Sequence, residues 1–378
     1  MALHVPHEET RVDFDRMDAV QEVYEAWWEG TLDRPLVNLV VVDPPEAAAG
    51  RIGPEPALPH RHFTGTYATD ISAERIVDRW DWELGRRRYV ADGYPSIWPN
   101  FGPGVLAAFL GARMIGREET IWFAPDRVEE PDQIQLRFDP SNVEFTRVSG
   151  IVRRAAELWN GRVQVGMTDL GGTLDVVQSF RPGELLATDL YDFPDEIKRL
   201  SWEVHEAWFD AFERLVAAAG PHNPGYSAWT ALLSARSYYM LQCDFSYLIS
   251  PAMFEEFVLP ELSASCRRLD RPFYHLDGPG QLPHLDMLLS IPELRGIQWV
   301  PGDGSPDVRH WPEVYRRITE AAKLIEVNTE HGATGVGVLD ELAEQIGSLA
   351  HVAVVGEVAA GEEEQAARRV LERHGVPW

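Results

Sequence analysis

Two side chains able to bind a metal ion or move a proton, His275 and Asp277, stand two positions apart in the sequence. They follow the apolar residues Phe273 and Tyr274 and precede Gly278, so we expect them where a buried strand ends and a loop begins. Side chains two apart on a strand share a face. An imidazole and a carboxylate held side by side can bind a divalent ion or act as an acid/base pair.

Other residues with useful chemistry also follow apolar, strand-like runs. Asp169 and Asp244 are candidates for acid/base catalysis or for stabilising a charged intermediate, although Asp169 before Leu-Gly-Gly could instead cap a helix. Cys243 is a candidate ligand, although a cysteine at a buried strand end is more often a small core residue. These alternatives stay open on the sequence alone.

Four further residues are candidates for substrate binding. Tryptophans combined with amide side chains can form the wall of an apolar pocket that holds a planar or bulky ligand. Tryptophans at such positions can equally be core residues. The four candidates are Asn100, Trp229, Gln298 and Trp299.

The elements that would position these residues alternate between strand and helix. Expected strands are 36–42, 120–123, 162–167, 238–242, 273–277, 296–300, 324–327 and 352–355, with a doubtful one at 226–229. Expected helices are 15–29, 73–89, 105–110, 142–160, 195–219, 250–269, 282–289, 308–322, 339–346 and 362–373, with a long surface loop from 43 to 62.

About eight strands, most followed by helices, indicate an α/β fold of the (β/α)8 TIM-barrel type with an N-terminal extension. A doubly wound sheet is the competing fold, but it normally has a glycine-rich turn after the first strand, where this chain has Asp43-Pro44-Pro45. We expect a single domain over 1–378, in which 1–93 includes N-terminal helices and the long loop. In such a barrel the active site lies at the C-terminal ends of the strands.

Composition limits the partners and the compartment. The formal charge of -26 opposes binding to nucleic acid or to anionic membranes. No stretch of about eighteen uncharged apolar residues is present, so we expect no membrane span. Two cysteines among 378 residues are too few for a disulfide framework, which makes a reducing cytoplasm the expected location.

Several motifs resemble the uroporphyrinogen decarboxylase superfamily. They are LQCDFSYLISPAMFEEFVLPEL at 241–262, YHLDGPGQLPHLDMLLSIPELRGIQWVPG at 274–302, NFGPG at 100–104 and TDLGGTLD at 168–175, and the resemblance spans 94–327. This superfamily includes decarboxylases and zinc-dependent methyltransferases that move a methyl group from a corrinoid protein to a thiol. The resemblance thus implies a barrel, one of these activities, a corrinoid protein or cobalamin as partner, and a homodimer.

The chain departs from the methyltransferase pattern at two positions. Those enzymes have a His-x-Cys where this chain has His275-Leu276-Asp277, and a late Gly-Cys where it has Gly356-Glu357. The resemblance therefore carries over His275 as a ligand but not the thiolates. A carboxylate makes the site harder, which keeps zinc as a candidate and favours other divalent ions more. Cys243 or Glu357 would supply further ligands.

Three functions follow from these residues. The first is a metal-assisted methyl or one-carbon transferase with a corrinoid or thiol co-substrate. The second is a decarboxylase or other lyase acting on a tetrapyrrole-like or other carboxylate, although the arginine-rich substrate loop of true decarboxylases is not found after Val42. The third is a glycoside hydrolase that pairs Asp169 with Asp277, and a noncatalytic binding role is a further alternative. Carboxyl groups about 5 or 7 to 9 Å apart across a groove would favour the hydrolase, whereas ligands converging on one point would favour a metal.

Overall fold

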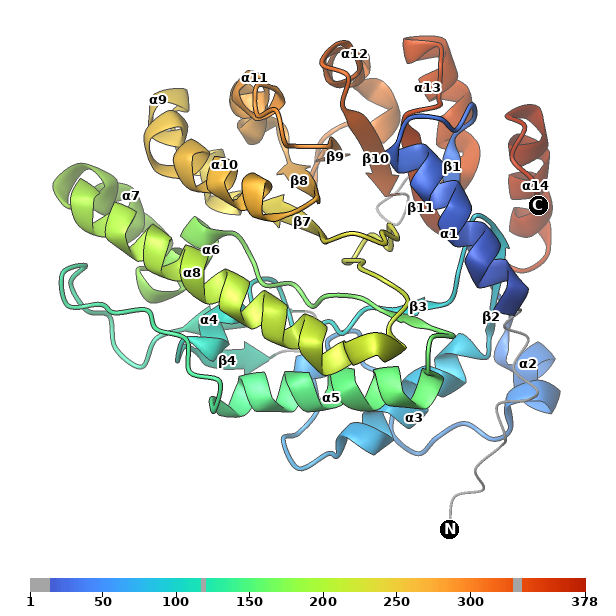
Figure 1. Ribbon diagram of the computed structural model, residues 1–378, viewed down its shortest axis with the longest axis horizontal. Coiled ribbons are helices and arrows are strands. Elements are labelled where there is room, and N and C mark those ends of the chain that lie inside the picture. The colour runs from blue at the N-terminus through green and yellow to red at the C-terminus, as the bar shows by residue number, and fades with distance from the viewer. Residues whose placement is uncertain (1–13, 117–119, 329–334) are drawn as a thin grey trace.

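The computed structural model describes residues 14–116, 120–328 and 335–378 and has a mixed α/β fold (Figure 1). Its main feature is a seven-stranded sheet in the order β2-β1-β11-β10-β9-β8-β7. All neighbouring strands run parallel except β2, which is antiparallel to β1. The strands are β1 Leu36–Val42, β2 Arg87–Ala91, β7 Tyr238–Gln242, β8 Arg271–Asp277, β9 Gly296–Val300, β10 Leu324–Asn328 and β11 Val352–Ala359.

Two small sheets accompany the large one. The short strands β3, Ser96–Ile97, and β6, Gln164–Val165, pair in parallel. The strands β4, Arg113–Gly116, and β5, Ile121–Ala124, form an antiparallel pair.

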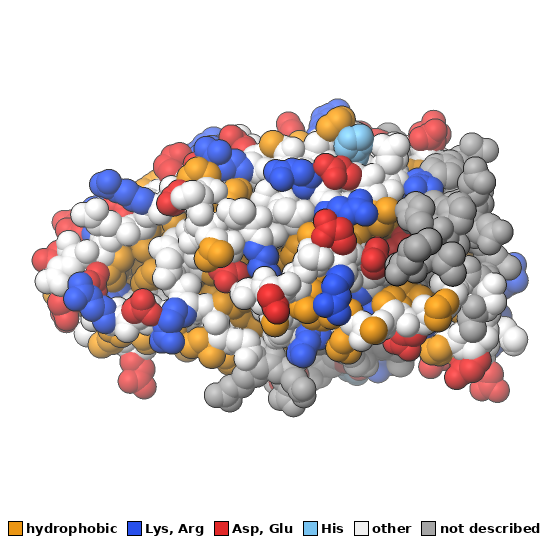
Figure 2. Space-filling model, turned by 90° about the horizontal axis from the view of Figure 1, so that it is seen from below, with side chains coloured by type: hydrophobic (Ala, Val, Ile, Leu, Met, Phe, Trp, Pro, Cys, Tyr) orange, Lys and Arg blue, Asp and Glu red, His pale blue; other side chains and the backbone are white. Residues whose placement is uncertain are grey.

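Helices cover the outer side of the large sheet and form a second group around α5 and α8 (Figure 1). None of the helices in the described part of the chain is long and apolar enough to cross a bilayer. On the face seen in Figure 2, acidic and basic side chains are interspersed. The helices are α1 Phe14–Trp28, α2 Pro45–Ile52, α3 Ala73–Leu84, α4 Leu106–Phe109, α5 Val143–Trp159, α6 Thr173–Phe180, α7 Gly183–Asp192, α8 Pro194–Ala219, α9 Pro251–Met253, α10 Leu259–Arg268, α11 Leu285–Leu289, α12 Pro312–Glu320, α13 Val338–Ile346 and α14 Glu362–Arg373.

The two faces of the parallel strands pack into different hydrophobic clusters, because side chains alternate along a strand. On β7, Tyr239 and Leu241 belong to the large cluster that includes the helices. Tyr238 and Met240 belong to a second cluster that includes residues of α1. We call these the outer and the inner face of the sheet.

Helix α1 packs on the inner face at the N-terminal ends of the strands. Trp28 lies 5.6 Å, centroid to centroid, from both Tyr238 and Phe273, near the starts of β7 and β8. Arg271, the first residue of β8, forms ion pairs with Glu25 of α1 at 2.6 Å. This end of the sheet is therefore closed by aromatic packing and a buried arginine, and the opposite end is left for the loops.

Several expected elements are confirmed. The strands at 36–42, 238–242 and 296–300 and the helix at 362–373 have the expected limits. The helix start at Ser250 is confirmed in detail, because its hydroxyl accepts a hydrogen bond from the backbone N–H of Met253 and Pro251 occupies the first turn.

Other expected elements were wrong. The helix expected over 73–89 ends at Leu84, and Arg87–Ala91 is strand β2 paired with β1. The expected loop 43–62 contains helix α2, which starts at a proline as many helices do. The strand expected over 162–167 is regular only at Gln164–Val165, because the side chain of Asn223 takes the place of a partner strand by bonding Val165.

Candidate metal centre

The register of three parallel strands places His275 between two glutamines on the inner face. His275 of β8 pairs with Gln242 of β7 and with Gln298 of β9. The Oε1 atom of Gln298 is hydrogen-bonded to Nδ1 of His275. Because a carbonyl oxygen can only accept, Nδ1 carries the proton, and in the neutral ring Nε2 keeps its lone pair. Nε2 lies on the side of Asp277, 3.9 Å from its Oδ2 atom.

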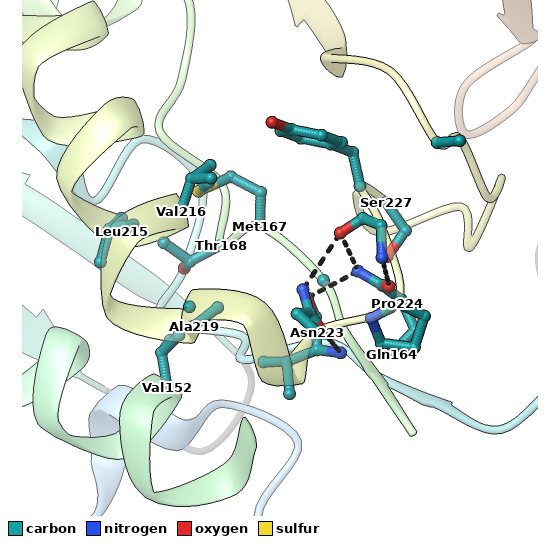
Figure 3. A pocket seen from close by; sticks show the side chains of 16 residues that line it. Val152, Gln164, Met167, Thr168, Leu215, Val216, Ala219, Asn223, Pro224 and Ser227 are labelled. Atoms are coloured by element: carbon teal, nitrogen blue, oxygen red, sulfur yellow. Dashed lines mark hydrogen bonds between the residues drawn. The ribbon is translucent and has the colours of Figure 1, made fainter. Parts of the chain in front are cut away.

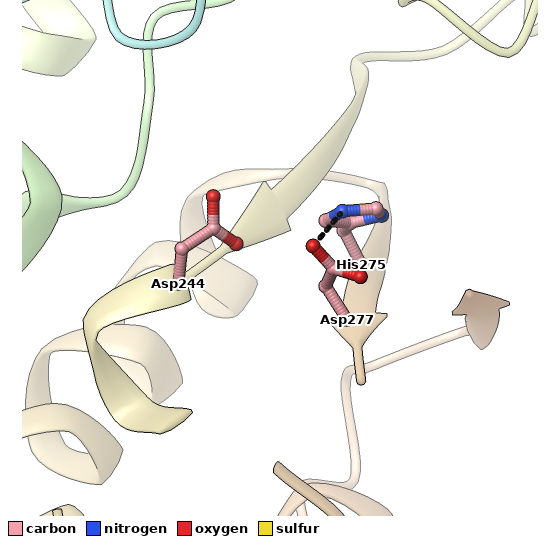
Figure 4. Close-up of side chains that lie close together, drawn as sticks. All are labelled: Asp244, His275 and Asp277. Atoms are coloured by element: carbon pink, nitrogen blue, oxygen red, sulfur yellow. Dashed lines mark ion pairs between the residues drawn. The ribbon is translucent and has the colours of Figure 1, made fainter. Parts of the chain in front are cut away.

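Asp244 completes a group of three potential ligands. One ligand atom from each of Asp244, His275 and Asp277 lies within 4.8 Å of the others (Figure 4). Ligands bound to one ion at about 2.1 Å stand roughly 3 to 3.5 Å apart, so small side-chain rotations would close the group. One imidazole and two carboxylates suit borderline and hard ions such as Zn²⁺, Mn²⁺ or Mg²⁺. An ion could enter from solvent, since Asp244 is exposed and the Asp277 side chain is 41% exposed.

Asp175 fixes the turn that carries Asp244. Asp244 starts the short 3-10 helix η4, Asp244–Leu248, immediately after β7. The Asp175 carboxylate accepts hydrogen bonds from the backbone N–H groups of Asp244, at 3.0 Å, and Phe245, at 2.8 Å. Burial raises the pKa of Asp175, and these N–H groups oppose that effect. Asp175 therefore positions Asp244, although Asp175 is not itself one of the three candidate ligands. The sequence did not indicate this role.

The centre concentrates negative charge. The surrounding protein and the carboxylates of Asp175, Asp277 and Asp169 raise the pKa of Asp244 well above its usual value. Among the residues that the structure describes, no lysine or arginine forms an ion pair with any of these four carboxylates. A bound cation would relieve the mutual repulsion.

Asp169 is the carboxyl group best suited to proton transfer. It is buried, and its Oδ1 atom accepts a hydrogen bond from the Gly171 backbone N–H at 2.8 Å. Burial raises the pKa of Asp169 to about 7, although this hydrogen bond opposes it. Helix α6 has Gly172 as its N-cap, so Asp169 bonds within the preceding turn and does not cap the helix.

Two glycines bring the Asp169 loop close to its neighbours. A Cβ atom on Gly171 would lie 2.7 Å from Cα of Gly104, and one on Gly172 would lie 2.2 Å from the carbonyl oxygen of Gln242. Gly171 also has a φ of +79°. The two glycines of the 168–175 motif therefore allow the loop to pack against β7 and against the 100–104 loop.

Two of the four expected substrate-binding residues contact the centre. Gln298 holds His275, as described above, and the Trp229 ring packs edge-on against the His275 ring with centroids 5.8 Å apart. Asn100 is buried, and its Oδ1 atom accepts a hydrogen bond from the Gly102 backbone N–H at 3.0 Å, so it shapes its own loop.

Trp299 and Cys243 lie on the other face of the sheet. Trp299 is fully buried in the outer cluster, where it packs against Trp311 at 5.0 Å. Cys243 belongs to the same cluster, and burial raises the pKa of its thiol well above the usual value, which disfavours the thiolate that would bind a metal. The alternation of side chains along β9 and β7 explains both corrections, since each residue directly follows one on the inner face.

Glu357 is also absent from the group of three. It lies on β11, and its nearest charged partner is Arg87 of β2, at 3.6 Å. Among the described residues, the ligands that converge are thus His275, Asp277 and Asp244.

Sequence reasoning overlooked one buried acid near the centre. Glu326 of β10 is fully buried and pairs in register with Gln298. A single acidic residue inside the apolar strand 324–327 was the signal that could have pointed to it, because a buried carboxylate is costly unless it is compensated.

No protein-family model matches the sequence, and no curated protein resembles it at a significant level.

Proposed function

We propose that this chain is a divalent-metal-dependent transferase of methyl or other one-carbon groups. The observation that carries the proposal is the convergence of Asp244, His275 and Asp277, with Gln298 bonded to the far nitrogen of the imidazole. A hydrogen bond at Nδ1 that leaves Nε2 facing the ligand group is the usual arrangement of metal-binding histidines. When bound, a divalent ion would lower the pKa of a coordinated thiol or hydroxyl group.

A residue of this chain would accept the proton that the acceptor thiol releases. In a transfer from a methylated corrinoid, the cobalt–carbon bond breaks with both electrons left on cobalt, and a carbon–sulfur bond forms to the acceptor. The acceptor thiol must lose its proton. Asp169, with a pKa of about 7, would accept it.

The carboxylate-rich surroundings disfavour the two alternatives. A decarboxylase for a polycarboxylate needs cationic side chains at its site, whereas the group around His275 is built from aspartates, which would repel such a substrate. A glycoside hydrolase needs two carboxyl groups facing each other across a groove. Here Asp277 converges with His275 and Asp244 on one point, which favours a metal.

We also propose that the sheet is part of a closed (β/α)8 barrel. The chain after β6 has bonds on both sides: Gly166 N–H donates to the Ile97 carbonyl at 2.8 Å, and Met167 N–H donates to the Ser227 carbonyl at 2.7 Å. Near β1, the Asn38 side chain donates to the Ala231 carbonyl at 2.9 Å. These contacts would help to close the sheet between its two edge strands, β7 and β2.

The partners we propose are a corrinoid protein or cobalamin as methyl donor and a second copy of the chain. The donor rests on the sequence motifs. Self-association is supported by large exposed apolar side chains at α7 and the start of α8, namely Leu185, Tyr191 and Phe193. Light scattering during gel filtration would test the dimer.

The test of function combines metal analysis with an assay. Protein purified without chelators should contain close to one equivalent of a divalent metal by elemental analysis. It should convert methylcobalamin and 2-mercaptoethanol to the methyl thioether, followed under anaerobic conditions by the loss of methylcobalamin absorbance. The variants H275A and D244N should lose metal and activity together.

The matched control is D303N, which changes an exposed aspartate in a loop after β9. It should keep both metal and activity. Metal-free wild-type protein, or equal metal content in wild type, H275A and D244N, would overturn the metal centre. Full metal content without methyl transfer would overturn only the reaction.

A further inference from the structure

A cavity of about 230 Å³ lies between helices and the chain around β6, and none of the three candidate metal ligands lines it. The last turns of α8 and a residue of α5 form one wall, as the left side of Figure 3 shows. The exit of β6 and the segment 223–227 form the other. None of the residues that line the cavity carries a charge.

The helical wall is apolar. It consists of Val152 from α5 and of Leu215, Val216 and Ala219 from α8. Such a surface offers no hydrogen bond to an occupant and favours an apolar body.

The opposite wall is polar, but its amides are already bonded to the backbone. Gln164 donates to the carbonyls of Val165 and Gly225, both at 2.9 Å, and accepts from Gly225 N–H at 2.9 Å. Asn223 accepts from Val165 N–H at 2.8 Å and donates to the Val165 carbonyl at 2.9 Å. These amides rigidify the wall and have little capacity left for a ligand.

One hydroxyl group in the cavity lining has no hydrogen-bond partner. It belongs to Thr168, which is 1% exposed. A buried hydroxyl without a partner costs about 1 to 3 kcal/mol, so a group that bonds it is expected.

Water alone is a poor match for this space. At about 30 Å³ each, roughly eight waters would fill it, and each needs two to four polar partners. The lining offers one free hydroxyl and an apolar wall. An engineered apolar cavity of about 150 Å³ binds benzene, so the present one has room for a somewhat larger molecule.

We propose that this cavity binds a small neutral molecule of about ten non-hydrogen atoms, with an aromatic or aliphatic body and one hydroxyl or carbonyl group. The body would lie against Leu215 and Val216, and the polar group would bond the hydroxyl of Thr168. The proposal is independent of the metal centre and of the reaction assigned to it.

Phenol is the probe, and benzene and benzoate are its comparators. Titration calorimetry with the full chain should show saturable binding of phenol. Benzene should bind about tenfold more weakly, because it leaves the Thr168 hydroxyl without a partner. Benzoate should not bind measurably, because no cation in the lining compensates its charge.

Variants locate the binding. A219L should fill the cavity and abolish phenol binding, whereas A217L makes the same change two residues earlier at an exposed position of α8 and should leave it intact. T168V should weaken binding about three- to tenfold. Urea unfolding would show that each variant is folded.

Three results would overturn the proposal. One is the absence of saturable phenol binding to the folded wild type, which would mean that the cavity holds water. Another is unchanged binding to A219L. The third is equal affinity for phenol and benzoate.

Discussion

His275 has a different contact on each side of its ring, and together they fix what it can do. Gln298 is bonded to Nδ1, Trp229 packs against the ring, and Asp277 lies beyond Nε2. A ring held in this way loses little rotational freedom when it binds an ion. We therefore expect metal selectivity to be set by the two carboxylates.

The change D277C should shift that selectivity. A thiolate is softer than a carboxylate, so zinc affinity should rise relative to manganese, by about tenfold or more. Competitive titration calorimetry with the two ions would measure the ratio. D303C, which adds a thiol at an exposed site, is the control and should leave the ratio unchanged. Equal ratios in D277C and wild type would place Asp277 outside the coordination sphere.

Asp169 should make the stability of the fold depend on pH. Its pKa is about 7 in the folded chain and about 3.9 when unfolded, so the folded state binds more protons between these values. Its contribution to stability is therefore greatest below about pH 4 and falls as the pH rises towards 7. D169N lacks this dependence, so it should gain up to about 4 kcal/mol relative to wild type between pH 4 and 8. Urea unfolding of both proteins across that pH range measures the gain. If the free energy of unfolding had the same pH dependence in D169N and in the wild type, the prediction would be contradicted.

The sequence predicted part of the centre. The spacing of His275 and Asp277 was enough to place both on one face. Asp244 was expected as an acid/base residue, and its place among the three candidate ligands was not foreseen. Cys243 and Trp299 were grouped with them because all lie near strand ends. Their position one residue along the strand puts them on the opposite face. The sequence shows this alternation, but it does not show which of the two faces carries the group of His275, Asp277 and Asp244.

At the scale of elements, the Asp169 loop depends on the absence of side chains at two glycines. G171A and G172A should each lower the free energy of unfolding by about 1 to 3 kcal/mol, because the added methyl would meet backbone atoms of Gly104 or Gln242. G150A is the matched control: it lies within α5 with no atom within 4 Å of an added Cβ. It should stabilise the protein by about 0.5 to 1 kcal/mol. Chemical unfolding of the three variants measures these changes in the free energy of unfolding. An equal loss of stability in all three would contradict the prediction.

Helix α6 should control metal binding through Asp175. D175A would free the two backbone N–H groups that hold the start of η4, so Asp244 would leave the ligand group more often. Metal affinity should fall about 10- to 100-fold, as for other outer-shell residues. D192N, at the exposed end of α7, should have no effect. Unchanged affinity in folded D175A would show that the turn holds its shape without this contact.

Elements with strong patterns were predicted well and irregular ones were not. The apolar run of β1 and the periodicity of α14 gave exact limits. Residues 87–89, the first part of β2, were assigned to a helix because their charged side chains continue those of α3, although Gly85 separates the two elements. The irregular exit of β6 depends on the side chain of Asn223, which lies 58 residues from Val165 in the sequence. Local patterns contain no information about such a contact.

At the scale of the whole molecule, the two ends of strand β8 have different roles. Arg271 at its start is 2% exposed, bonds both carboxylate oxygens of Glu25 at 2.6 Å and lies over the Trp28 ring. His275 and Asp277 at its other end belong to the candidate metal centre. Six residues of strand separate the two ends by roughly 20 Å.

The change R271L should therefore affect stability and leave metal binding intact. It removes the partner of two carboxylates on α1, Glu25 and Glu29, and should cost about 3 kcal/mol of unfolding free energy. The hydrogen bonds from Arg271 lower the pKa of Glu25, so the stability that this pair provides is present at neutral pH and is lost as the pH falls below the usual glutamate range. The difference between wild type and R271L in urea should accordingly shrink in acid.

The reciprocal change, H275A, should cost less than about 1 kcal/mol in metal-free protein, because it removes a partly exposed side chain from an open site. Metal affinity should behave in the opposite way, changing less than about twofold in R271L and falling below detection in H275A. Urea unfolding of metal-free protein and calorimetric titration of the folded variants provide the four values. Loss of metal affinity in folded R271L would mean that the packing of α1 reaches the far end of the strand and that the sheet transmits strain along β8. Preserved affinity would show that metal binding at the C-terminal end of β8 does not depend on the packing of α1 at the N-terminal end. The residues of the metal site could then be substituted without loss of the stability that Arg271 provides.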